Sequence, residues 1–215
     1  MKTKIFKSVT LAAVLAFTVS CKDNENEVEA SAAQDAATAT IEAVTYTVDA
    51  SNSNIEWVGS KVAGQHNGDI SIKSGMVMVN GKSIESGEFT IDMNTIAVTD
   101  LKGEEADGLR GHLSSEDFFD VEKFPTATFT VTGVSEKDGK TMLEGNLTMK
   151  EQTKNVAFPV TVKYDGDKMM LDSETFTIDR TDWGIKYGSE SLADVVKDKA
   201  ISDDIELKVN LVASK

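Results

Sequence analysis

Two arginines stand out in this 215-residue sequence, because the other 20 of its 22 basic residues are lysines. A guanidinium presents a planar fork of donors that holds a carboxylate or phosphate in one geometry, which a lysine cannot do. Arg110, with His112 beside it, could therefore meet the polar head of a bound ligand. The alternative is structural, with Arg180 in an ion pair with Asp182 or Asp117. An Arg110→Lys substitution that lowered stability and left ligand uptake unchanged would leave only the structural role.

The sequence gives little support to catalytic or metal chemistry. His66 and His112 are the only histidines, and the acidic residues are scattered rather than clustered, so we expect no metal site. A Gly-rich phosphate loop and a nucleotide fingerprint are both absent from the sequence, so we expect no cofactor. A lipid hydrolase that uses Ser114 or Ser115 with His112 is disfavoured, because helix capping explains neighbouring residues on one turn better. We therefore expect that the protein is not an enzyme.

The segment that must position these groups, residues 110–129, changes character twice. Ser114 or Ser115 can cap a short helical turn, and the Phe118–Phe119 pair then faces an apolar interior. Pro125 ends that turn, and beyond it apolar residues alternate with threonines, which is strand spacing. We expect a helical lid that leads directly into a sheet.

Elsewhere apolar residues recur at every second position, which indicates β-strands separated by tight turns such as Asn80-Gly81, Asp138-Gly139 and Asp165-Gly166. About eight antiparallel strands can close into a barrel that is filled by its own side chains or holds one small ligand. Two stretches, 99–124 and 189–200, break the pattern and are expected to cover a barrel mouth, the second as a short helix. The alternating runs are Ile55 and Trp57, Ile70 and Ile72 with Met76 and Met78, Phe89 to Met93, the strand after Pro125, Leu143 to Met149, Val156 to Tyr164, Phe176 and Ile178, and Ile205 to Leu211.

The N-terminus predicts export. Three lysines, an apolar run over 9–19 and small residues before Cys21 are typical of a lipoprotein signal peptide at residues 1–20. Cys21 is the only cysteine, so it has no disulfide partner, and we expect it to be lipidated and to anchor the protein to a membrane. Ordinary signal cleavage near Ser20 is the alternative. The acidic run after Cys21 resembles the export tag of Bacteroidetes surface lipoproteins, which favours the outer membrane of the cell envelope, on its periplasmic or its exposed face.

Composition separates a tether from a single domain. Residues 21–43 contain hardly a bulky apolar side chain, so we expect a disordered acidic tether there and one domain over residues 44–215. Removing the signal peptide changes the formal charge from −14 to −17, with 19 basic residues left against 36 acidic ones. Such a field repels phosphate backbones, which excludes nucleic acid as a partner.

Three motifs carry a resemblance to the YceI-like family. They are HLSSEDFFDVEKFP at 112–125 followed by a Thr-rich strand, GNLTM at 145–149 leading to VAFPV at 156–160, and FTIDRTDWGI at 176–185. The likeness covers roughly residues 44–212, with a departure at 150–155, where the family usually has a His-Gly-Val-Thr type of turn. The resemblance implies a mainly β, lipocalin-like barrel of eight antiparallel strands that binds an isoprenoid or other long-chain lipid. Dimers also occur among similar proteins, so a homodimer is a further expectation.

Together these observations predict a membrane-tethered carrier for an apolar lipid, such as an isoprenoid quinone, a polyprenyl phosphate or a fatty acid derivative. The alternative is a self-filled barrel that serves as a cell-envelope interaction or stress-protective protein. The abundant methionines suit a surface that adapts to variable chains, although they also fill gaps in ordinary cores. The residues expected to line the cavity and its mouth are Trp57, Met76, Met78, Phe89, Ile91, Arg110, His112, Phe118, Phe119, Phe124, Phe129, Met149, Phe158, Phe176 and Trp183.

Overall fold

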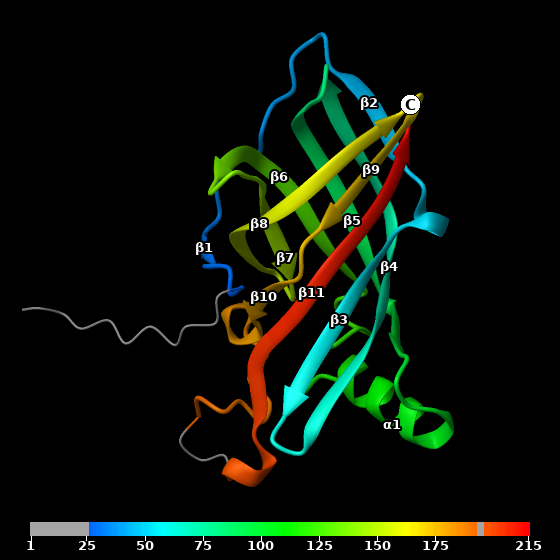
Figure 1. The fold of residues 1–215 in the computed structure, drawn as a ribbon. Helices are drawn as coiled ribbons and strands as arrows, with labels where there is room; N and C mark the ends of the chain where they lie inside the picture. The colour runs from blue at the N-terminus through cyan, green and yellow to red at the C-terminus, as the bar shows by residue number, and fades with distance from the viewer. Residues whose placement is uncertain (1–25, 193–195) are drawn as a thin grey trace, which may run out of the picture.

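Strands with one apolar face curl into a closed barrel in the computed structural model of the chain (Figure 1). Neighbouring strands pair antiparallel throughout the ring, and β11 closes it by pairing with β3 on one edge and β9 on the other. The expected eight-stranded antiparallel barrel is therefore confirmed. Its strands are β3 (Asn54–Lys61), β4 (Gly64–Asn80), β5 (Ser83–Val98), β6 (Thr126–Lys137), β7 (Lys140–Met149), β8 (Gln152–Asp165), β9 (Lys168–Ser173) and β11 (Ile201–Ser214).

The structure describes residues 26–192 and 196–215. The expected signal peptide and the lipidation of Cys21 lie outside these residues. Within them, no helix is both long and apolar enough to cross a bilayer.

Three further strands attach to the ring. β2 (Val44–Val48) pairs with β4 and β11, β10 (Phe176–Asp179) pairs with β11, and β1 (Ser31–Ala32) pairs with β8. The alternation at Phe176 and Ile178 was expected to mark a barrel strand, but it belongs to β10, which lies beside the ring. The eighth strand of the barrel is instead β9. The reason is the tight turn at Asp165-Gly166, which returns the chain beside β8 and buries Met169 and Leu171.

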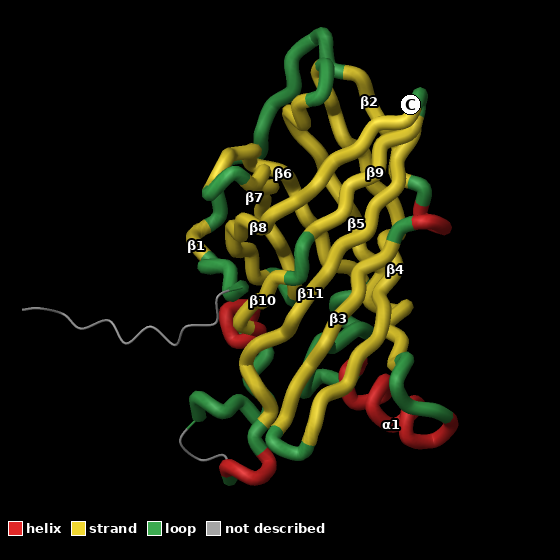
Figure 2. The backbone as a smooth tube through the Cα atoms, in the orientation of Figure 1, coloured by secondary structure: helices red, strands yellow, loops and turns green. Residues whose placement is uncertain are grey.

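The helices α1 (Gly103–Ser114) and η3 (Lys197–Lys199) lie at the same end of the barrel, which we call the mouth end (Figure 2). It also holds the β3–β4 hairpin and the loop that follows η2 (Arg180–Trp183). The opposite end holds the β4–β5 and β8–β9 hairpins, η1 (Ala50–Asn52) and the C-terminus.

The helix near the mouth is α1, and it ends where the sequence predicted a helix to begin. Ser115 is the C-cap of α1, with its backbone N–H and Oγ donating to the His112 carbonyl at 3.1 and 2.7 Å. Glu104 and Glu105 instead occupy its first turn, where acidic side chains are favourable. Turns follow as far as Pro125, and Asp120 has a φ of 49°, which stops any continuing helix. In the second interrupted stretch, η3 forms at residues 197–199, and residues 193–195 lie outside the description.

Residues 26–43 pack along the outside of the barrel, contrary to the expected disordered tether; we call them the strap. Val28 and Thr177 are joined by a backbone hydrogen bond of 2.9 Å, and Ala37 N donates to Val131 O at 2.9 Å. Val28, Ala30 and Ala37 pack against the core. Small apolar residues are enough to order the strap, because the barrel wall supplies both an apolar surface and backbone groups that bond to it. The composition of the strap alone does not indicate these long-range contacts.

An apolar cavity and its polar mouth

The barrel interior is hollow. It encloses a cavity of about 550 Å³, within the range of about 300–1,000 Å³ that is usual for small-molecule sites. Buried aliphatic side chains such as Ile72, Leu171 and Val156 form much of its wall. The alternative of a barrel filled by its own side chains predicted no such space.

Four phenylalanines form a connected row in the cavity wall. The rings of Phe158 and Phe176 stack with centroids 4.2 Å apart and an interplanar angle of 4°. Phe129 lies 5.5 Å from Phe158 and 6.2 Å from Phe89, at tilted angles. Gly145 lets the Phe129 ring lie against the backbone of β7, because a Cβ there would collide with that ring.

The polar part of the wall lies at the mouth. Barrel strands supply apolar side chains along the rest of the interior, whereas the β3–β4 hairpin, α1, the segment after β10 and the start of β11 supply the polar groups. An amphipathic ligand would therefore place its apolar chain inside and its polar end at the mouth. The polar lining residues are Ser60, Lys61, His66, His112, Arg180, Tyr187, Asp198, Lys199, Ser202 and Asp204.

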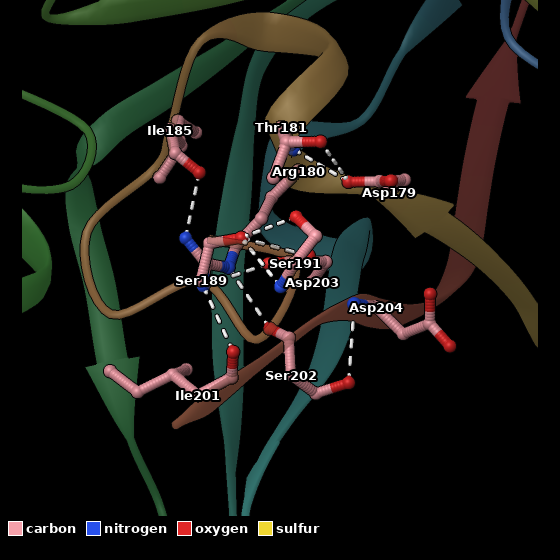
Figure 3. A network of polar contacts seen from close by, with 10 residues as sticks. All are labelled: Asp179, Arg180, Thr181, Ile185, Ser189, Ser191, Ile201, Ser202, Asp203 and Asp204. Atoms are coloured by element: carbon pink, nitrogen blue, oxygen red, sulfur yellow. Dashed lines mark hydrogen bonds and ion pairs between the residues drawn. The ribbon is translucent and has the colours of Figure 1, made fainter. Parts of the chain in front are cut away.

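Arg180 ties the loop after η2 to the barrel at the mouth (Figure 3). Its guanidinium is buried and donates to three backbone carbonyls, from Nε to Ser202 at 3.0 Å, from Nη1 to Ile185 at 2.7 Å and from Nη2 to Ile201 at 3.1 Å. The guanidinium carbon lies 5.4 Å from the centroid of the Phe118 ring, which adds a cation–π contact. Arg180 thus fixes the start of the loop against β11.

The acid partner of Arg180 is Asp203, whereas the sequence suggested Asp182 or Asp117. Nη2 of Arg180 lies 3.3 Å from Oδ1 of Asp203 as an ion pair without hydrogen-bond geometry, and Oδ2 of Asp203 accepts from Ser189 Oγ at 2.9 Å. Burial is the main influence on the pKa of Arg180 and lowers it, and the nearby charge of Asp203 partly opposes this shift. An arginine starts from so high a pKa that the group stays charged.

Three rings close over the mouth from two sides. His112 of α1 lies 4.8 Å from the Tyr187 ring and 5.0 Å from the Phe118 ring, and Phe118 lies 5.9 Å from Tyr187. The segment formed by α1 and the turns after it therefore meets the loop after η2 at these three rings, which we call the latch. Because all three residues also line the cavity, a ligand that enters by this route must displace or pass the latch.

Ten of the fifteen residues expected at the cavity do line it. Besides the latch residues His112 and Phe118, the lining contains Phe119 from the same turn and seven residues of the strands. Those seven are Trp57, Phe89, Ile91, Phe129, Met149, Phe158 and Phe176.

Met76 and Met78 do not line the cavity. β4 shifts its register against β5 between Ile72 and Ser74, and an inserted residue turns the following side chains to the opposite face. Ile72 therefore points inward before the shift and Val77 is buried after it, which leaves Met76 51% exposed on the outer surface. Without this shift, the alternation that starts at Ile70 and Ile72 would have placed Met76 and Met78 on the inner face, as the sequence predicted.

Arg110 also lies away from the cavity. Its side chain is 55% exposed on α1 and makes a 3.0 Å ion pair with Asp107, one turn earlier in the helix. Leu109, His112 and Leu113 form the helix face that lines the cavity, and Arg110 falls outside it. The expected contact with a ligand head group is therefore not supported, because α1 extends over residues that were expected to precede a helix.

Phe124 and Trp183 pack elsewhere. Phe124 is half-buried beside Lys123, whose Nζ lies 4.7 Å from the ring centroid. Trp183 is fully buried, but its Nε1 donates to the Leu147 carbonyl at 3.0 Å, so the indole packs in the core rather than in the cavity wall.

Sequence reasoning missed several lining residues. Leu109 and Leu113 were missed because α1 was not expected, and Leu171 because β9 was not recognised. The spacing of Leu109 and Leu113, four residues apart, was the available signal for one helix face. Tyr187 had no such signal, since only the fold brings it to His112.

The fold and the cavity place the protein in the class of hollow, lipocalin-like β-barrels. Residues 46–213 match the YceI-like domain, and the chain belongs to that family. The expected family resemblance is therefore confirmed.

Curated relatives match shorter stretches. The chain is 31% identical over 109 residues to a UPF0312 protein of Pseudomonas putida strain F1, covering 47% of this chain and 54% of that protein. It is 41% identical over 56 residues to Protein YceI of Salmonella arizonae, covering 26% and 29% of the two chains. The chain thus spans about half or less of the length of these relatives.

Two solved structures share the fold. BcnA of Burkholderia cenocepacia superposes with a TM-score of 0.61 at 23% identity, covering 78% of this chain and 99% of that one. A polyisoprenoid-binding domain from Saccharophagus degradans, implicated in plant cell wall breakdown, superposes with a TM-score of 0.57 at 17% identity, covering 79% and 97%.

Proposed function

We propose that this protein is a membrane-tethered, non-enzymatic carrier that holds a long-chain apolar lipid inside its barrel. The observation that carries the proposal is the cavity of about 550 Å³, apolar along the strands and polar only at the mouth. Burial of each methylene group supplies roughly 0.8 kcal/mol, from which the cost of ordering the chain is subtracted.

The lipid class we propose is an isoprenoid, as a quinone or a polyprenyl compound. Support comes from the family and from the fold shared with the polyisoprenoid-binding domain of Saccharophagus degradans. An apolar wall discriminates poorly between chains, since one methylene changes affinity by only about 1–3 kcal/mol. Fatty acid derivatives of similar girth are therefore expected to bind as well.

The tether we propose is a lipid on Cys21, with the protein held at the outer membrane of the cell envelope. Its support is the sequence alone, in which an apolar run and small residues precede the only cysteine. A carrier held at a membrane would stay next to the source of its ligand.

Native mass spectrometry of residues 22–215, which lack the expected signal peptide and Cys21, purified without detergent, tests carriage. We expect a bound mass that organic extraction releases as a single class of long-chain lipid. A protein that never carries such a mass, and that takes up none of an added isoprenoid quinone after gentle delipidation, would contradict the proposed function.

A further inference from the structure

Large apolar side chains are exposed around the mouth. Val62 at the tip of the β3–β4 hairpin is 69% exposed, and Val196 beside η3 is 63% exposed. Tyr187 and Leu192, in the loop after η2, are also exposed. We call these four residues the apolar rim. They border the open end of the cavity: Tyr187 is part of its lining, Val62 lies between the lining residues Lys61 and Ala63, and Val196 lies two residues before the lining residue Asp198.

The strap begins in the mouth half of the barrel. Thr177 N donates to Asn26 O at 2.9 Å, Thr177 pairs with Glu206, and Glu206 pairs with Val58. Asn26 is therefore level with Val58 across the sheet. Val62 lies four residues further along the hairpin, which corresponds to roughly 14 Å.

The length of chain before the strap limits where an anchor can lie. Cys21 precedes Asn26 by five residues, which span at most about 18 Å. That length reaches the level of the hairpin tip. The far end of β11, at Ser214, lies eight residues beyond Glu206, or roughly 27 Å in the opposite direction. An anchor on Cys21 can therefore bring the mouth to a membrane and cannot bring the far end there.

We propose that the mouth docks on the surface of the lipid bilayer that holds the anchor, with the apolar rim inserted between head groups. A lipid could then pass from the bilayer through the latch into the cavity without crossing water. This inference rests on the proposed function, because it needs both the anchor and the apolar cargo. The driving force is apolar insertion, since the strongly acidic chain repels anionic surfaces.

The far end offers a matched control. Ile41 is 96% exposed where the strap reaches the opposite end of the barrel, next to Thr40, whose Oγ1 donates to Glu85 at 2.7 Å. Exposed apolar area alone would therefore make Ile41 an equally good insertion point. The strap geometry predicts that it stays in water.

The test uses the full lipidated chain in vesicles of phosphatidylethanolamine and phosphatidylcholine, which carry no net charge, with Val62→Cys or Ile41→Cys labelled by an environment-sensitive maleimide dye. A lipidated Cys21 has its sulfur in a thioether and cannot react, so each variant carries one dye. We expect a blue-shifted emission from position 62 that brominated lipids quench, and an unshifted, unquenched emission from position 41. Equal quenching at both positions, stronger quenching at 41 or none at 62 would overturn the docking proposal.

The outcomes separate docking from the proposed function. Dye uptake by the unsubstituted chain would show a free Cys21 thiol. The proposed lipidation of Cys21 would then be wrong, and so would the docking of the mouth that depends on it. Quenching at position 62 in a protein that carries no extractable lipid would retain docking and remove carriage. Far-UV circular dichroism verifies that both exposed substitutions leave the barrel folded.

Discussion

At the scale of single residues, the two arginines have different surroundings and should have different consequences when removed. Arg180 is buried against three carbonyls and Asp203, whereas Arg110 is 55% exposed and pairs with Asp107. Removing one partner of a buried ion pair is costly because the other charge is left uncompensated. Exposed pairs within a helix contribute little.

Arg180→Met should lower the free energy of unfolding by about 3–5 kcal/mol, because Asp203 loses its ion-pair partner and three backbone carbonyls lose their donor. Arg110→Met, which removes a similar side chain from the surface, should change it by less than about 0.5 kcal/mol. Urea unfolding followed by circular dichroism measures both. Similar losses in the two variants would contradict the structural role assigned to Arg180.

The importance of Arg180 could be inferred from its rarity among basic residues, but its partner could not. Asp182 and Asp117 were considered because they are near in sequence or motif, yet Asp203 is 23 residues away and reaches Arg180 only because β10 pairs with β11. The ion-pair partner of Asp182 is instead Lys154, whose Nζ lies 3.7 Å from Oδ1 of Asp182. Contacts of this kind depend on strand pairing, which sequence patterns do not specify.

At the scale of elements, local pattern predicted most strands and failed at irregularities. The alternation in β7 and β8 is continuous, and both strands appear as expected. In β4 the register shifts invert the predicted face of Met76 and Met78, since no local residue preference marks the bulge. The strap was missed for a related reason, because its order comes from the barrel wall rather than from its own composition.

The strap should be protected in solution. Amide hydrogens of Val28, Gln34 and Ala37, which donate to Thr177, Asn146 and Val131, should exchange more slowly than in an unstructured peptide. Hydrogen–deuterium exchange measured by NMR or mass spectrometry resolves this segment. The exposed amide of Ile41 in the same segment is the internal reference. Exchange of all four at unprotected rates would mean that the tether is free and that the anchor geometry does not hold.

At the scale of the whole molecule, the account depends on a closed barrel with an unfilled interior. The number of strands and their alternation predicted closure, but they left open whether side chains would fill the space. The row of phenylalanines shows how the space survives, since large rings lie along the wall and Gly145 makes room behind Phe129. The volume of the cavity depends on all the strands together, so no single sequence motif predicts it.

The most direct measurement is a titration of delipidated protein with a long-chain isoprenoid quinone, followed by quenching of tryptophan fluorescence. Trp57 lines the cavity, so its emission should fall and saturate at one quinone per barrel. Ala127→Phe, which fills the cavity from β6, should abolish the saturable quenching, while Ala157→Phe, on the half-buried outer face of β8, should retain it. Saturable quenching that is equal in both variants, or quenching that never saturates, would contradict a lipid bound inside the barrel.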